Sequence, residues 1–122
     1  MLTLSPVQLT DLPRLFLIDV PVDETPAMHI RNALQSLSLL KEQSPAFWAC
    51  NTELGQTAVH ATAALMVVEH GGPVAMTLDH LRAAIRALLC CDCDWEIVVE
   101  VKTSCGRLLW ALVQLTGDPR FN

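Results

Sequence analysis

The chain contains no tyrosine, and only 17% of its 122 residues are charged. Soluble domains usually carry about 25% charged residues, so charge is scarce here. The eight basic residues are scattered along the chain, and the formal net charge is −5. Binding to nucleic acid by phosphate neutralisation needs clustered lysine and arginine. We therefore expect no nucleic-acid partner.

The sequence also lacks the motifs of common enzymatic sites. It contains no G-x-S-x-G, no H-E-x-x-H and no G-x-G-x-x-G pattern. The acidic run of Asp92, Asp94 and Glu96 lacks the glycine and the spacing of a calcium loop. No nucleophile motif accompanies the four histidines, which are His29, His60, His70 and His80. We therefore predict a non-enzymatic protein with no catalytic residue, no metal site and no cofactor.

Long apolar runs are missing as well. No stretch reaches the roughly 18 apolar residues of a membrane-spanning helix. Met1 to Thr10 lacks the positive charge and apolar core of a secretory signal. The five cysteines are an odd number, and three of them cluster at Cys90, Cys91 and Cys93, which favours reduced thiols over a disulfide framework. We expect a cytoplasmic protein without a membrane partner.

What the chain has in excess is apolar surface. Hydrophobic residues make up 52% of the sequence, which is more than a single domain over residues 1–122 can easily bury. A large exposed apolar patch usually marks a binding surface for a protein partner or a second copy. The composition therefore favours an interaction protein.

Three helices are predicted, over Asp23 to Gln43, Asn51 to His70 and Thr77 to Cys91. Asp23 or Thr25, Asn51 and Thr77 would cap their first turns, and Gly71 would end the second helix in a left-handed conformation. Apolar residues cover nearly all faces of the second helix, which is typical of a buried helix. We expect the rest of the chain to wrap around it.

The predicted fold class is α+β, with the three helices on a small, mainly antiparallel sheet. Arg14 to Val22 would form one strand, and Glu96 to Lys102 would form a second. Thr103 to Gly106 would turn the chain, with Gly106 free to take a positive φ, into a return strand over Arg107 to Leu115. Leucine and alanine favour helix in this last segment, so an all-α bundle is the alternative.

A strand over Arg107 to Leu115 would have two apolar faces, and helices could cover only one of them. Leu108, Trp110 and Leu112 would share the uncovered face, and tryptophan is enriched in interface hot spots. We predict these three residues as a partner-binding surface, with either Arg82 and Arg86 or the acidic run at Asp92 to Glu96 fixing the register at its rim.

The functional hypothesis is a small regulator or inhibitor that docks on a target protein or forms a homodimer. Its mechanism would be burial of a Leu/Val/Trp surface. The alternative is a thiol-based redox sensor or metal-binding protein that uses the cysteine cluster Cys90, Cys91 and Cys93.

Overall fold

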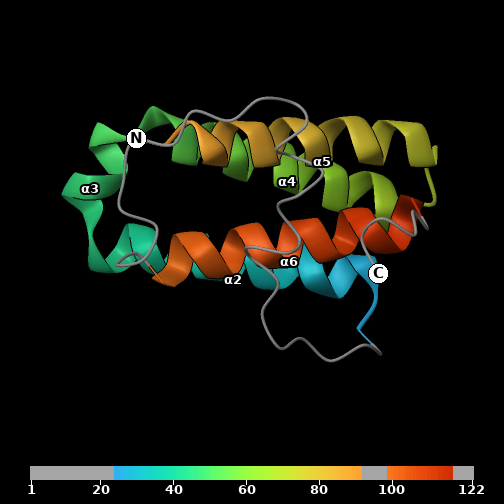
Figure 1. The fold of residues 1–122 in the computed structure, drawn as a ribbon, viewed down its shortest axis with the longest axis horizontal. Coiled ribbons are helices and arrows are strands. Elements are labelled where there is room, and N and C mark those ends of the chain that lie inside the picture. The colour runs from blue at the N-terminus through green and yellow to red at the C-terminus, as the bar shows by residue number, and fades with distance from the viewer. Residues whose placement is uncertain (1–23, 92–98, 117–122) are drawn as a thin grey trace.

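The computed structural model of the chain describes residues 24–91 and 99–116 (Figure 1). Within these residues the chain forms four long helices and one short one. They are α2 (Pro26–Gln43), α3 (Pro45–Cys50), α4 (Thr52–Glu69), α5 (Val74–Leu89) and α6 (Val99–Thr116).

The predicted α+β fold is wrong, because the described residues contain no strand, and the all-α alternative is the one that fits. Residues 99–116, expected as part of a β-hairpin, form the single helix α6. Gly106 lies buried inside this helix, and Gly71 is the only described glycine with a positive φ. The expected strand over Arg14 to Val22 and the start of the strand over Glu96 to Lys102 lie outside the described residues.

Residues 99–116 form a helix. Their apolar residues fit helical spacing, although they also fit the alternation of a strand. Val101, Cys105 and Leu108 are fully buried at intervals of one turn, and Leu109 and Leu112 extend the same side. Leucine and alanine also have higher helix propensity than strand propensity. The turn signal at Gly106 was too weak to interrupt this pattern.

The four long helices form an up-and-down bundle in two layers, with α4 and α5 in one and α2 and α6 in the other (Figure 1). Each helix packs on two neighbours, so that α2 contacts α4 and α6 while α5 contacts α4 and α6. The colour sequence in Figure 1 shows that contacting long helices run in opposite directions. Short connections between antiparallel helices are typical of this architecture.

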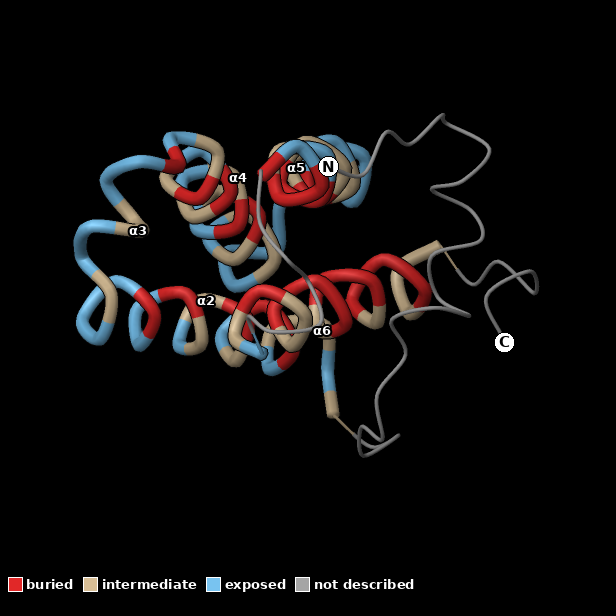
Figure 2. The backbone as a smooth tube through the Cα atoms, turned by 60° about the vertical axis from the view of Figure 1, so that its left-hand side comes forward, coloured by how far each residue is buried: buried red, intermediate tan, exposed pale blue. Residues whose placement is uncertain are grey.

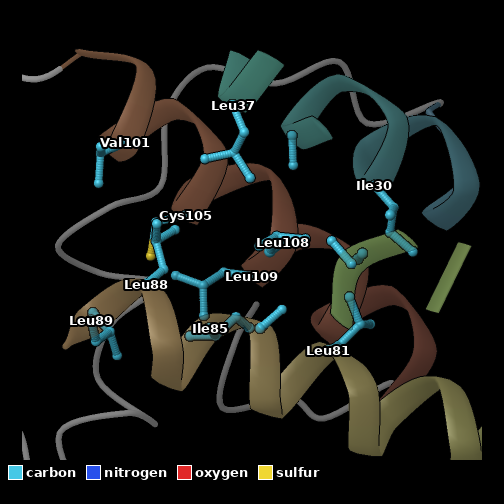
Figure 3. Packing of buried hydrophobic residues seen from close by; sticks show 14 of the residues in the cluster. Ile30, Leu37, Leu81, Ile85, Leu88, Leu89, Val101, Cys105, Leu108 and Leu109 are labelled. Carbon is cyan, nitrogen blue, oxygen red and sulfur yellow. The ribbon is translucent and has the colours of Figure 1, made fainter. Parts of the chain in front are cut away.

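The core lies between the two layers and is built mostly of leucine, isoleucine and alanine (Figure 3). Leu108 and Leu109 project from α6 among side chains of the other helices, and both are fully buried. A polar contact joins the layer of α2 and α6 internally, because the buried Ser104 hydroxyl donates to the Ala33 carbonyl oxygen at 3.1 Å. Of the described helices, α6 contributes the most buried residues.

The expectation that the helix after Asn51 is buried on all sides is wrong. Leu54, Ala61 and Ala64 of α4 face the core, but Val59 and Met66 are 67% and 55% exposed. Figure 2 shows buried and exposed positions alternating around α4. Among the described helices, only α2 and α5 pack closely on α4, together with the short α3, and they leave one side of it uncovered.

The predicted helix ends agree with the structure in part. Thr25 caps α2, since its hydroxyl accepts a hydrogen bond from the Met28 amide at 3.3 Å, and Gly71 has a φ of 68° after α4. Asn51 is at the N-cap of α4, but its side-chain amide donates to the Phe47 carbonyl oxygen instead. Thr77 is not a cap, because α5 begins one turn earlier at Val74 and buries Thr77.

Candidate functional site

A buried polar cluster lies between the N-terminal end of α2 and the second half of α6. The Arg107 guanidinium donates to the Glu24 carboxylate and lies 3.4 Å from His29 Nδ1. The side chains of Glu24 and Arg107 are 15% and 18% exposed, and His29 is fully buried. Gln114 donates from Nε2 to the Glu24 carbonyl oxygen at 2.6 Å. These contacts fasten α2 to α6.

Helical spacing brings the members of the cluster together. Arg107, Trp110 and Gln114 recur at one-turn intervals on α6, so they share one side of it. The Trp110 ring stacks on the His29 ring at 6.3 Å between centroids, with 16° between the planes. Sequence reasoning missed this cluster because a strand over residues 107–115 would have placed Arg107 and Gln114 on opposite faces.

The electrostatics of the cluster favour a neutral His29. Burial lowers the pKa of this imidazole, with the Glu24 carboxylate acting against the shift and the Arg107 guanidinium adding to it. The Nδ1 atom of His29 lies 3.4 Å from the Arg107 guanidinium, which can only donate, and 3.4 Å from a Glu24 carboxylate oxygen, which can only accept. Nδ1 therefore meets a donor and an acceptor at the same distance.

Some buried polar atoms of the cluster have no hydrogen-bond partner within residues 24–91 and 99–116. Four of its buried polar atoms have no hydrogen-bond partner among the described residues, namely His29 Nε2, Arg107 Nε, Trp110 Nε1 and Gln114 Oε1. A buried polar atom without a partner costs about 1–3 kcal/mol. The unpartnered atoms therefore offset part of the stability that the contacts among Glu24, Arg107 and Gln114 contribute.

The lowered pKa of His29 gives an expected dependence of stability on pH. Below about pH 6.5 the unfolded chain gains a proton that the folded chain resists, so the free energy of unfolding should fall by up to about 1.4 kcal/mol per pH unit. Urea denaturation at several pH values measures this slope. A His29→Gln variant should have a smaller slope, whereas the exposed His70→Gln should keep it. Equal slopes in both variants would show that His29 does not carry the effect.

The residues predicted as a partner-binding surface do not share an exposed face. Leu108 is fully buried and Leu112 is 4% exposed, because both belong to the core side of α6. Trp110 is half-buried against His29. On α5, Arg86 is exposed and Arg82 is half-buried, and they lie in the other layer of the bundle from α6. The premise of that surface was the strand, which the helix α6 replaces.

The cysteines are spread over several environments. Cys50 and Cys90 are exposed, while Cys91 and Cys105 are buried. Burial raises the pKa of the Cys105 thiol to about 12, so it stays protonated at neutral pH. Cys93 lies outside the described residues. Among residues 24–91 and 99–116, no three metal-ligating side chains of His, Cys, Asp or Glu gather at one point.

The outer face of α4 carries no charged residue over most of its length. No Asp, Glu, Lys or Arg occurs between Glu53 and Glu69. Along the side opposite the core, Val59, Thr62 and Met66 are exposed and Gly55 is partly exposed. Exposed apolar residues in a continuous stripe indicate a contact surface more strongly than the same residues scattered singly.

Two histidines meet where α4 packs on α5. Nδ1 of His60 lies 3.4 Å from Nδ1 of His80, and the ring centroids are 5.6 Å apart. Both side chains are partly exposed. The pair is therefore open to solvent, in contrast to the polar cluster between α2 and α6.

These features define an all-helical, up-and-down bundle with one uncharged outer face. Comparison with protein families, curated proteins and solved structures gives no match to this chain. In the part of the chain that the structure describes, no helix has the length and apolarity needed to cross a membrane.

Proposed function

We propose that this chain is a non-enzymatic interaction module that binds a second copy of itself through the outer face of α4. The observation that carries the proposal is the uncharged stripe along this face, on which Val59 and Met66 are 67% and 55% exposed. Burying such residues against a partner gains about 25 cal/mol for each Å² of apolar surface removed from water. Homodimer interfaces have more apolar cores than other contacts do.

Charge complementarity favours a second copy as the partner. A polar stripe on α2 runs beside α4, as the contact between Arg31 and Glu69 establishes. All its members are exposed, with a cation at one end and an anion at the other, in the order Arg31, Gln35, Ser38, Glu42. A two-fold axis that pairs the faces antiparallel places Arg31 opposite Glu42 of the second copy, twice per dimer.

The same axis also matches the apolar residues. Since Arg31 lies beside Glu69 and the two helices run antiparallel, the midpoint of the α2 stripe is level with the midpoint between Val59 and Met66 to within about one turn. Val59 then packs against Met66 of the second copy, and the ion pairs flank this contact. The arrangement has the apolar centre and polar rim of a typical interface.

The net charge and the exposed thiols of the chain are compatible with a regulatory role through protein binding. The net charge of −5 disfavours nucleic acid as a partner. The exposed thiols of Cys50 and Cys90 suit a reducing compartment, which makes the cytoplasm the location we propose. On this proposal the polar cluster between α2 and α6 keeps the bundle in one register, and the outer face of α4 does the binding.

Val59→Glu is expected to weaken self-association by about 2 kcal/mol or more, because the interface would then bury an unpaired carboxylate. Sedimentation or light scattering should give a dimer, at twice the 13.4 kDa of one chain, for the wild type and a monomer for the variant. The matched control is Val99→Glu, since Val99 is 64% exposed on α6 in the other layer.

The charge pairing is tested separately. Glu42→Arg should weaken the dimer, because an arginine would then lie opposite Arg31 of the second copy, while the contact of Arg31 with Glu69 in its own chain is left in place. A wild-type chain that stays monomeric at high concentration would contradict the proposal. So would Val59→Glu and Val99→Glu variants that associate equally well.

A further inference from the structure

His60 and His80 face each other from α4 and α5, on the two helices joined by the turn at His70–Pro73. Their Nδ1 atoms are 3.4 Å apart, and both rings reach solvent. Neither residue belongs to the polar cluster between α2 and α6, nor to the outer stripe of α4. The pair therefore needs an explanation of its own.

A hydrogen bond between the two rings would be long. Nitrogen donors usually lie about 2.7–3.2 Å from their acceptors. Two imidazole nitrogens bound to one tetrahedral zinc ion, each about 2.0–2.1 Å from the metal, lie about 3.3–3.4 Å from each other. The observed 3.4 Å between the two Nδ1 atoms equals the separation of two ligands on one ion.

We propose that His60 and His80 chelate one divalent transition-metal ion, of which zinc and cobalt are the representative probes. Neutral imidazole is a ligand that suits zinc, copper, nickel and iron. Within the described residues no further His, Cys, Asp or Glu completes a group of three ligands. Water would fill the positions that the two imidazoles leave, as it fills the one position that three protein ligands leave in a catalytic zinc site. This site goes beyond the sequence-based expectation of no metal.

The ion would act as a cross-link between α4 and α5. Each helix supplies one ligand, from positions 20 residues apart in the chain. An ion that binds the folded chain and not the unfolded chain raises its stability in proportion to the logarithm of ion concentration. The metal therefore holds these two helices together without using the face of α4 that we assign to self-association.

Cobalt titration of the full chain tests the site. The wild type should bind one Co²⁺ per chain, give visible d–d absorption without a sulfur-to-cobalt charge-transfer band, and melt about 5 °C or more higher at saturating ion. His60→Gln and His80→Gln should each weaken binding at least about tenfold, because a lost ligand costs no less than a lost second-shell partner. His70→Gln is the matched control, since His70 is exposed at the end of α4.

Retained binding in both glutamine variants would overturn the proposal, as would a wild type that binds no cobalt. A charge-transfer band would also overturn it, because thiolates such as those of Cys50 or Cys90 would then hold the ion. Either result leaves the dimer proposal untouched, because that proposal is tested with Val59→Glu, a variant that keeps both histidines. Circular dichroism of the variants checks that each remains helical.

Discussion

Replacing Arg107 by methionine is expected to lower the free energy of unfolding by about 3 kcal/mol, measured by urea denaturation. Methionine keeps much of the apolar stem but leaves the Glu24 carboxylate, which is 15% exposed, without its counter-charge. Removing one partner of a largely buried pair costs more than the pair itself contributes, because the remaining charge stays desolvated. This substitution tests whether the cluster between α2 and α6 fixes their pairing.

The ion pair between Arg31 and Glu69 provides the matched control. Its side chains are 52% and 37% exposed, so Arg31→Met should cost less than about 1 kcal/mol when both methionine variants are compared in the Val59→Glu background, which removes the proposed dimer contact of Arg31. The double variant Glu24→Leu/Arg107→Met should recover most of the loss, because it removes both charges together. A similar small effect of Arg31→Met and Arg107→Met would mean that water screens the pair as it does on the surface.

Leu108→Ala and Leu109→Ala should each lower the free energy of unfolding by about 3 kcal/mol, within the usual 2–5 kcal/mol for a buried leucine. Both side chains are fully buried in the core of the bundle (Figure 3). Each substitution removes apolar contacts and leaves a cavity between the two layers. The similar loss at neighbouring positions is a consequence of the helix.

A strand would have given different results at these two positions, with one leucine covered and the other facing away. Val99→Ala is the control on the same helix, since Val99 is 64% exposed and should change stability by less than about 0.5 kcal/mol. A loss at Leu109 alone would contradict the helical packing of α6. Thermal and urea denaturation together establish whether unfolding stays cooperative in each variant.

The contact surface that the composition predicts is now assigned to the outer face of α4 instead of residues 107–115. Its basis was the 52% hydrophobic composition, which remains a property of the chain. The helix α6 buries Leu108 and Leu112, and the large hydrophobic residues that stay exposed are spread over α2, α4, α5 and α6. The two on α4, Val59 and Met66, share one side of a helix that has no charged residue between Glu53 and Glu69. A stripe on a helix also changes the geometry of binding, because helices pair through residues one turn apart.

The sequence alone was enough to locate the three long helices before residue 92 and several of their ends, but not the short helix α3. Thr25 and Gly71 took their expected positions because capping and a left-handed glycine depend on local backbone geometry. The stripe of Ile30, Ala33 and Leu37 faces the core as its spacing predicts. Such signals depend on residues only a few positions apart, so they can be recognised without knowledge of the tertiary structure.

Only the tertiary structure decided the form of residues 99–116, because apolar residues there satisfy both a two-residue and a 3.6-residue period. Packing on α2 and α5 resolves that ambiguity in favour of helix, and brings Arg107 to Glu24 across 83 residues. Packing also decided that α4 keeps an exposed face and that His60 meets His80. A sequence pattern states which residues share a side of a helix, while the neighbours available to cover that side depend on how the whole chain folds.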